Sequence, residues 1–491
     1  MGNHFEDQLL RYGGGVASTT MTGATVALVL AAILLFFFLP QKYVIVPFLF
    51  VSIFMPMAQV VVISGLHFMV FRIMLPFAWV RVIGGKLFGH SNNDGFRFGA
   101  IDKAIVLWVL VDTVCFTLLW GEWGAFVNRL GFLYNVFGTY FLLRFLIRDR
   151  EDVNRTIRTL AIVCALVAVF MVREQLTGRN TFSVFGVVPE VTLVREGRLR
   201  SQAASAHAIL AGTLGATLLP LFVGLLWQGG KSKIAVLGVL SAVIMTLASG
   251  SATPLLACLA GIAALCMWPF RRRLRLFRWG VVIGLISLHL VMRAPVWALI
   301  GRISVVGGAS GWHRYELINQ AILHFGDWWL LGARNPSNWG RELGDTSDAY
   351  VEAAVTGGLL TLLFFLGILW QSFRALGIAG KAAEKNRRLE LLLWAYGAAL
   401  FSNVVAFFGT TYFDQTILVW YALLAMICAV TSIAPVLAPE SENTPGDQVP
   451  PLGPATGFPG GAEGKPLTVF GSGKQTQCFC YVADVVTPLL N

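Results

Sequence analysis

The chain has 491 residues, of which 56% are hydrophobic and only 13% are charged, and its formal net charge is +11. Soluble domains carry about 25% charged residues, so this composition excludes an ordinary soluble protein and indicates a polytopic membrane protein. The Lys and Arg residues lie in short clusters between apolar runs and not along one polar face. We therefore expect contacts with membrane lipids and no nucleic-acid partner.

Apolar segments of membrane-spanning length recur from residue 21 to residue 437. They predict an all-α bundle of about 12 to 13 transmembrane helices. The expected spans are 21–39, 43–63, 66–84, 101–120, 125–147, 155–172, 203–227, 232–249, 251–268, 277–292, 350–373, 389–409 and 412–434. Pro47, Pro56 and Pro76 interrupt the second and third segments, and a re-entrant hairpin is the alternative to a span there.

Basic clusters between the spans predict the orientation of the bundle. They lie at 144–152, 231–233, 271–278 and 381–388, and by the positive-inside rule they should face the cytoplasm. Counting spans then puts two longer polar stretches, 173–202 and 293–349, on the opposite, extracytoplasmic side. The larger of them is the expected extracytoplasmic loop of the bundle.

Both ends of the chain differ from the membrane domain at 21–437. Residues 1–20 form an N-terminal tail, and the Pro-, Gly- and acid-rich segment 438–465 predicts a disordered linker. Residues 466–491 resemble a short internal piece of the extended short-chain dehydrogenases, the sugar-nucleotide epimerases and decarboxylases. The piece has neither a glycine-rich dinucleotide turn nor a Tyr-x-x-x-Lys pair, so we expect an inert fusion remnant, with a chance match as the alternative.

The stretch "WHRYELINQAILHF" in the larger loop has apolar and aromatic residues at helical spacing. It predicts a helix on the membrane surface that holds Arg314 at the level of the lipid headgroups. Trp328 and Trp329 are expected in the same zone, as membrane-belt residues or, alternatively, as platforms on which sugars stack. Gly357 and Gly358 are expected to permit close helix packing.

Three stretches of the chain carry a resemblance to one family. They are "REGRLRSQAASAHAILAGTLGATLLPL", "ASGSATPLLACLAG", and "WHRYELINQAILHFGDWWLLG" followed by "DTSDAYVEAAVTGGLLTLLFF". These stretches resemble the O-antigen ligase and polymerase superfamily of bacterial membrane proteins, and the similarity extends over most of residues 20–435. The resemblance implies a GT-C-like helix bundle with a large extracytoplasmic loop.

The family's activity follows from the same resemblance. It implies a glycosyltransferase of the bacterial inner membrane that moves a glycan from an undecaprenyl diphosphate carrier to a hydroxyl of a glycan or lipid-linked acceptor, as ligase or polymerase, in O-antigen or exopolysaccharide biosynthesis. Arg200 and Arg314 match the family's extracytoplasmic arginines, which engage the diphosphate. A transporter or flippase of lipid-linked precursors and a non-catalytic assembly partner are the alternatives.

The chemistry of these residues agrees with that role. A planar guanidinium binds phosphate oxygens in a bidentate manner, and two or three arginines can stabilise a departing diphosphate without a metal. We therefore expect metal-independent transfer with no cofactor. The alternative role of both arginines is to anchor helices at the membrane–water interface. Arg198 is more readily an ordinary interfacial charge.

The acceptor hydroxyl should need a base. Many family members carry a histidine ahead of the helix that contains "EAAVTGGLL", whereas this chain has "GDTSDAY" there. Asp348 is our first candidate for the base, Asp345 and His207 are the others, and His313 could support them. A helix cap is the alternative role of both aspartates, and packing at a helix start is that of His207.

The expected spans also contain charged residues. Arg72 and Asp112 fall within apolar segments, where an unpaired charge is costly, so we expect them to pair with each other or to face a polar cavity.

Overall fold

The structure is a computed structural model and describes residues 18–63, 66–87, 98–228, 233–302, 310–340, 346–384 and 386–437. Two compact units divide the chain, Met1–Ala438 and Pro439–Asn491, and the second lies outside the described residues. The linker and the dehydrogenase-like piece fall there, as do the first 17 residues.

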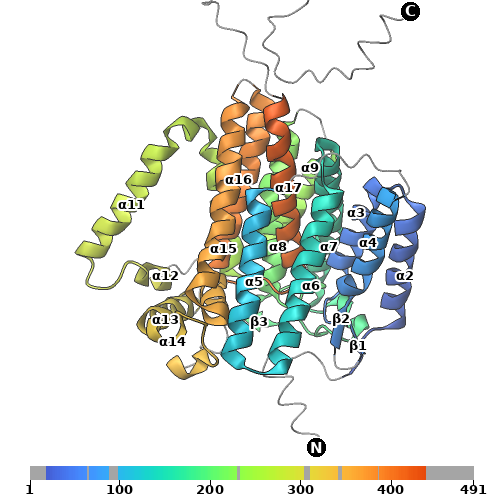
Figure 1. Cartoon of the computed structure of the whole chain (residues 1–491), viewed down its shortest axis with the longest axis horizontal. Helices are drawn as coiled ribbons and strands as arrows, with labels where there is room; N and C mark the ends of the chain where they lie inside the picture. The colour runs from blue at the N-terminus through green and yellow to red at the C-terminus, as the bar shows by residue number, and fades with distance from the viewer. Residues whose placement is uncertain are drawn as a thin grey trace, which may run out of the picture. The chain divides into compact units, whose positions relative to one another are not determined.

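The described part is mostly helical (Figure 1). Its α-helices are α2 (Gly23–Phe38), α3 (Ile45–Phe54), α4 (Val70–Leu87), α5 (Ala100–Trp120), α6 (Trp123–Leu146), α7 (Arg150–Thr177), α8 (Ala208–Trp227), α9 (Lys233–Ala248), α10 (Ala252–Cys266), α11 (Leu274–Val291), α12 (Ala298–Arg302), α13 (Ser310–Leu323), α14 (Phe325–Trp328), α15 (Ala349–Ala382), α16 (Arg387–Phe407) and α17 (Gln415–Leu437). The 3₁₀ turns are η1 (Gln41–Tyr43), η2 (Thr181–Phe185), η3 (Trp268–Arg273) and η4 (Pro336–Trp339). Two antiparallel hairpins complete it, β1 (Val60–Ile63) with β2 (Leu66–Met69), and β3 (Val194–Arg195) with β4 (Arg198–Leu199).

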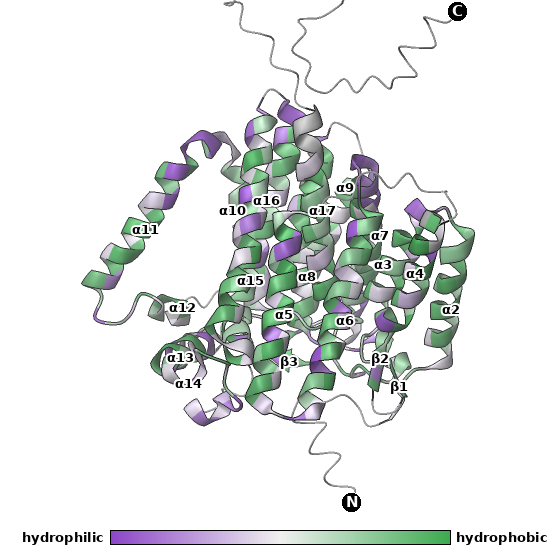
Figure 2. Cartoon of the chain, viewed as in Figure 1, coloured by the Kyte–Doolittle hydropathy of each residue, from purple (hydrophilic) through white to green (hydrophobic). Residues whose placement is uncertain are grey.

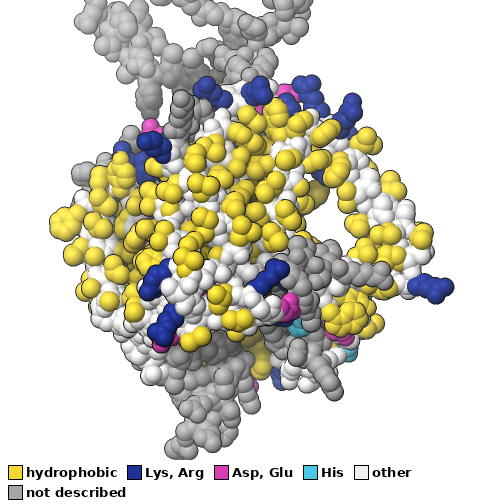
Figure 3. All heavy atoms as spheres, turned by 180° about the vertical axis from the view of Figure 1, so that it is seen from behind, with side chains coloured by type: hydrophobic (Ala, Val, Ile, Leu, Met, Phe, Trp, Pro, Cys, Tyr) yellow, Lys and Arg dark blue, Asp and Glu magenta, His cyan; other side chains and the backbone are white. Residues whose placement is uncertain are grey.

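Seven of the described helices are long and apolar enough to cross a membrane, and four further apolar helices are shorter. One shorter example is α9, which has 16 residues and is therefore about 24 Å long. Apolar side chains dominate the middle of the helices (Figure 2), and Lys and Arg side chains lie above and below a broad hydrophobic band (Figure 3). The chain is therefore an all-α protein of the membrane-embedded type.

The segment 43–84 departs from the expected pair of spans. Its first half contains α3, which ends at Phe54 ahead of Pro56, and its middle forms the β1–β2 hairpin with Val60 opposite Met69. A proline cannot donate the backbone hydrogen bond that a continuing helix needs, so the chain leaves the helix before Pro56. Pro76 is tolerated inside α4.

The centre of the bundle is α8, which packs against α9, α10 and α16. Small residues on α8 permit this close contact. A Cβ atom at Gly215 would lie 2.8 Å from the Ala242 carbonyl oxygen of α9, and one at Gly224 would lie 2.6 Å from the Ala395 Cβ of α16. Neither position has room for a side chain, so these glycines set the helix spacing.

The longest helix contains a break. Gly357 and Gly358 of α15 leave helical geometry, and Gly358 has φ +75°. A Cβ atom at Gly358 would lie 2.5 Å from the Leu330 carbonyl oxygen, and Leu359 N donates to Trp329 O at 2.8 Å. The pair therefore permits close packing of a loop against α15, where the sequence suggested packing between helices.

One helix lies apart from the others. None of the residues of α11 is buried, and the helix stands beside the bundle in Figure 1. It is anchored at its start, where Arg271 of η3 forms an ion pair with Glu390 of α16.

The basic segments around 150, 271 and 385 join helices at one end of the bundle, and the polar stretches around 200 and 330 lie at the other end (Figure 1). We call the latter the loop end. The candidate site residues that the structure describes all lie near it.

Candidate active site

Two arginines meet the start of one helix at the loop end. Arg200 Nη2 donates to Ser251 Oγ at 2.6 Å, and Arg314 Nη2 donates to Thr253 Oγ1 at 2.6 Å. Ser251 is the N-cap residue of α10, and Thr253 lies in its first turn. Residues that are more than 100 positions apart in the chain are thereby held at one helix N-terminus, where the helix dipole favours negative charge.

A tight hairpin positions Arg200. Glu196 and Gly197 connect β3 to β4 with φ values of +54° and +73°, the pattern of a two-residue type I′ turn. Arg200 follows β4, and its backbone N–H donates to Leu193 O at 2.9 Å. At Gly250, a Cβ atom would lie 2.9 Å from the Leu199 carbonyl oxygen, so a glycine is required where the hairpin meets α10.

The segment after the hairpin is held by a buried carboxylate, Glu174 of α7. Its Oε2 accepts from the backbone N–H groups of Gln202 at 3.1 Å and Ala203 at 2.9 Å. Ala203 has φ +49°, which is unfavourable for a residue with a Cβ, and its carbonyl oxygen accepts from Asn180 Nδ2 at 2.8 Å. These bonds impose the left-handed conformation and thereby fix the path from Arg200 to α8.

Both guanidinium groups keep an unused donor. Arg314 is buried and Arg200 is half-buried, and the Nε atom of each is buried without a hydrogen-bond partner among the described residues. Burial lowers the pKa of both groups, and the positive charge of Arg195 lowers each further, while Asp348 opposes the shift at Arg314. An anion bound here would satisfy these donors and offset the repulsion among three cations.

Asp348 lies beside this cluster at the start of α15. It caps the helix, because its Oδ1 accepts from the backbone N–H groups of Tyr350 at 2.8 Å and Val351 at 3.0 Å. Its Oδ2 atom is buried and has no partner in the described part of the chain. Burial raises the pKa of Asp348 to about 6, against the opposing effect of the two N–H groups and of Arg314. The residue therefore combines the capping role with a free carboxylate oxygen whose pKa lies close to neutral pH.

His207 is placed less favourably for catalysis. It is the exposed N-cap residue of α8, its side chain makes no capping bond, and its ring packs edge-on against Phe413 at 5.8 Å between centroids. The half-buried His313 precedes Arg314 on α13, and Asp345 lies outside the described residues.

The sequence did not point us to a further buried carboxylate at the loop end, Asp414. Its Oδ2 accepts from Ala206 N at 2.7 Å, its Oδ1 is buried without a partner among the residues described, and burial raises its pKa to about 7. The available signal was an acid in "FDQT", directly ahead of an apolar span. Gln415 Nε2 reaches Ala204 O at 3.1 Å, so this element also holds the stretch between Arg200 and His207.

Several other expected positions are corrected or sharpened. Trp328 is buried and its indole N–H donates to Ala321 O at 2.7 Å, so it packs inside the loop and not at the headgroup surface. Trp329 is 47% exposed and is still accessible to lipid. Arg198 is exposed on β4, whereas Leu199 and Arg200 after it are half-buried.

Arg72 and Asp112 do not pair with each other. Asp112 of α5 forms an ion pair with Arg129 of α6 at 2.7 Å, and Arg72 donates to Asn135 Oδ1 and to His67 O, both at 2.6 Å. Each of the two charged groups therefore has its own partners in the fold. These contacts offset the free-energy cost of burying an unpaired charge within an apolar span.

The helix α13 carries Arg314 into the cluster. Leu317 and Ala321 on the same helix pack against Val351 and Val355 of α15, which begins at Asp348. The expected helix is present, but these members of its apolar face contact protein. This packing fixes the guanidinium relative to the carboxylate.

No protein-family model matches this chain, and no curated protein matches it. Within the described ranges, no group of three or more His, Cys, Asp or Glu residues could hold a metal ion. The groups at this end that could act chemically are the two arginines, the α10 N-terminus and the carboxylates of Asp348 and Asp414.

Proposed function

We propose that the protein is a membrane glycosyltransferase of the O-antigen ligase and polymerase type. It moves a glycan from an undecaprenyl diphosphate carrier to an acceptor hydroxyl during synthesis of a cell-surface polysaccharide. One observation carries the proposal. Arg200 and Arg314 bond two hydroxyls of the α10 N-terminus, and the Nε atom of each is buried without a partner among the described residues. Asp348, whose Oδ2 also has no partner there, interacts electrostatically with Arg314.

The arginine cluster fits the donor. A lipid diphosphate places two adjacent anionic groups just outside the hydrocarbon, where three cations and a helix N-terminus meet at one end of the bundle. In the proposed complex, Arg200 and Arg314 bind the phosphate oxygens through donors that have no partner among the described residues. They then stabilise the charge that develops on the leaving diphosphate, and this supplies the electrostatic part of catalysis without a metal.

Asp348 fits the role of the base. With a pKa of about 6 its carboxyl is mainly ionised at pH 7, and Oδ2 is the oxygen not used for capping. In the proposed step the acceptor oxygen bonds to the anomeric carbon while the bond from that carbon to the diphosphate breaks. The acceptor proton passes to Asp348, and undecaprenyl diphosphate leaves.

The location of the site follows from the same proposal. The loop end faces outward from the bacterial inner membrane, and the basic segments at the other end of the bundle face the cytoplasm. The donor's polyprenyl tail stays in the bilayer while its diphosphate reaches the arginines at the headgroup level.

The test is a transfer assay on the full chain in lipid vesicles, with an undecaprenyl diphosphate glycan and its acceptor. We expect Arg200→Ala and Arg314→Ala each to lower the transfer rate by about 100-fold, the typical effect of removing one donor to a developing anion. Arg198→Ala is the matched control, because Arg198 is exposed on the same hairpin, and it should keep the wild-type rate. Full turnover by both active-site variants would overturn the proposal.

A further inference from the structure

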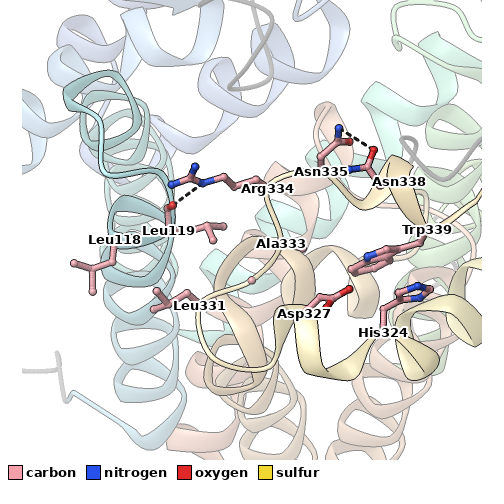
Figure 4. A pocket seen from close by; sticks show the side chains of 11 residues that line it. Leu118, Leu119, His324, Asp327, Leu331, Ala333, Arg334, Asn335, Asn338 and Trp339 are labelled. Atoms are coloured by element: carbon pink, nitrogen blue, oxygen red, sulfur yellow. Dashed lines mark hydrogen bonds between the residues drawn. The ribbon is translucent and has the colours of Figure 1, made fainter.

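A hollow of about 640 Å³ lies at the loop end, between the C-terminal end of α5 and residues 324–339 (Figure 4). We call it the loop hollow. Its volume falls in the range of small-molecule sites, and its polar groups come from a short stretch of chain. None of the residues that line it belongs to the arginine cluster, so the loop hollow needs its own explanation.

The walls of the loop hollow are held in place. Arg334 Nε donates to Leu119 O at 2.9 Å, which ties the loop to the C-terminal carbonyls of α5. Ala333 N donates to Val355 O at 2.8 Å, which ties it to α15. Gly332 lies between these anchors with φ +102°, and a Cβ atom there would overlap the Val355 carbonyl. A site framed in this way is organised before a ligand arrives.

One wall is aromatic. The rings of His324 and Trp339 stack with centroids 5.2 Å apart and planes 10° apart. His324 Nδ1 lies 3.0 Å from the Gln320 carbonyl oxygen, which only accepts, so this nitrogen carries a proton. The contact orients the imidazole and, through the stack, supports the indole. Asp327 and Trp339 point toward each other across the loop hollow in Figure 4.

The polar groups are suited to hydroxyls. Asn335 Nδ2 donates to Asn338 Oδ1 at 3.4 Å, and the Asn338 NH₂ group makes no bond to any described residue. The Asp327 carboxylate likewise has no hydrogen bond or ion pair within the described part of the chain, and it can only accept. Donors and an acceptor without partners among the described residues therefore line the same hollow, and a hydroxyl can pair with both kinds because it donates and accepts.

The charge of the loop hollow disfavours an anion. Arg334 lies at its edge, but two of its nitrogens point to the carbonyl oxygens of Leu119 and Trp120. The Asp327 carboxylate would repel a phosphate or a uronic acid. An indole with neutral donors, an acceptor carboxylate and leucines instead suits the mixed apolar and hydroxylated faces of a neutral sugar.

We propose that the loop hollow binds neutral saccharide residues of the glycan. This proposal rests on the proposed transferase function and names a subsite for it. The connection is structural: α13, which carries Arg314, leads directly into His324, and its Leu317 and Ala321 pack on the part of α15 that begins at Asp348. Sugars held in the loop hollow are thereby fixed relative to the diphosphate and the base.

The experiment measures saccharide binding by calorimetry with the purified full chain in lipid nanodiscs. The probes are maltotriose, mannotriose and triacetylchitotriose as neutral sugars, and trigalacturonate and inorganic phosphate as anions. We expect at least one neutral trisaccharide to bind more tightly than either anion. Asn338→Ala and Trp339→Ala should each weaken that binding by at least about tenfold.

Two controls make the result specific. The first is Asn338→Ala: because Asn338 is exposed, its replacement leaves the fold intact even if Trp339→Ala does not. The second is Trp312→Ala, which removes an indole that is 62% exposed on α13, outside the loop hollow. The Trp312 variant should bind like the wild type. Absence of binding by all three neutral sugars, tighter binding of an anion, or full binding by Asn338→Ala would each overturn the proposal.

The same assay separates this proposal from the proposed function. Arg200→Ala and Arg314→Ala should each lower the transfer rate by about 100-fold while saccharide binding stays at the wild-type level. If the wild type binds sugar but transfers none, the saccharide site stands and the transferase function fails.

Discussion

Asp348 lies in surroundings that differ sharply from those of an exposed aspartate. It is fully buried, it caps α15 with Oδ1, and its Oδ2 is left over. A cap alone needs only one acceptor oxygen, and Asn caps a helix about as well as Asp. The buried ionised carboxylate is therefore costly for folding, and helix capping alone does not explain it.

Replacement of this carboxylate should separate activity from stability. Since the pKa of Asp348 is about 6, wild-type transfer should fall about tenfold from pH 7 to pH 5, as the base becomes protonated. Asp348→Asn should lower the transfer rate at pH 7 by at least about 100-fold. The pH–rate profile tests this, and a wild-type profile that is flat between pH 5 and pH 7 would contradict the role of Asp348.

The stability of the same variant should change in the opposite direction. A folded-state pKa above the ordinary aspartate value means that this group stabilises the fold below about pH 4 and that the contribution is lost as pH rises through 6. In the wild type this lost contribution to the free energy of unfolding amounts to up to about 3 kcal/mol at pH 7. Asp348→Asn does not titrate and so does not lose it. Its Tm should therefore equal or exceed that of the wild type at pH 7, and a much lower Tm would show that the carboxylate is needed for folding.

At the scale of elements, the kink in α15 connects the loop to the bundle. Gly358 has φ +75° and lies against the Leu330 backbone. Gly358→Ala should strain the backbone and push the loop away, at a cost of about 1–3 kcal/mol in stability, with a matching loss of transfer. Thermal unfolding and the transfer assay measure the two effects.

Gly367 is the matched control on the same helix. A Cβ atom there would have no heavy atom within 4 Å, and its backbone is helical. Gly367→Ala should therefore be neutral or slightly stabilising. Equal effects of the two substitutions would contradict the role of the kink.

Sequence patterns predicted where the helices lie in the chain, but not where each helix ends or breaks. Each expected span contains a helix, because long apolar segments have few other solutions in a membrane. The helix within the segment 43–63 is shorter than expected, because α3 ends ahead of Pro56 and the β1–β2 hairpin follows. The break at Gly357–Gly358 was not predictable, because the apolar pattern runs through it without interruption.

The candidate site was predicted in part. Arg200 and Arg314 became candidates through the resemblance of their motifs to a family, but their common contact with the α10 N-terminus depends on residues far apart in sequence. Asp414 was missed because an acid before a span resembles an ordinary helix cap. The pairing of Asp112 with Arg129 was likewise invisible, since only the packing of α5 on α6 brings them together.

For the whole molecule, the orientation in the membrane is the assumption on which the site depends. Its test uses single cysteines in a variant with Cys266, Cys478 and Cys480 changed to Ser, because Cys115, Cys164, Cys258 and Cys428 are buried. A cysteine in place of Arg198 should react with an impermeant maleimide in intact spheroplasts. One in place of Glu384, which is exposed at the basic end, should react only after lysis. The reverse pattern would exclude an extracytoplasmic site.

The most direct test of the central claim measures binding of undecaprenyl diphosphate to the protein in nanodiscs, with undecaprenyl monophosphate for comparison. We expect the diphosphate to bind more tightly than the monophosphate. Arg200→Ala combined with Arg314→Ala should weaken the affinity for the diphosphate by at least about 100-fold, and Arg198→Ala should leave this affinity unchanged. Equal affinity of the double variant and the wild type would contradict the assignment of these arginines to the diphosphate.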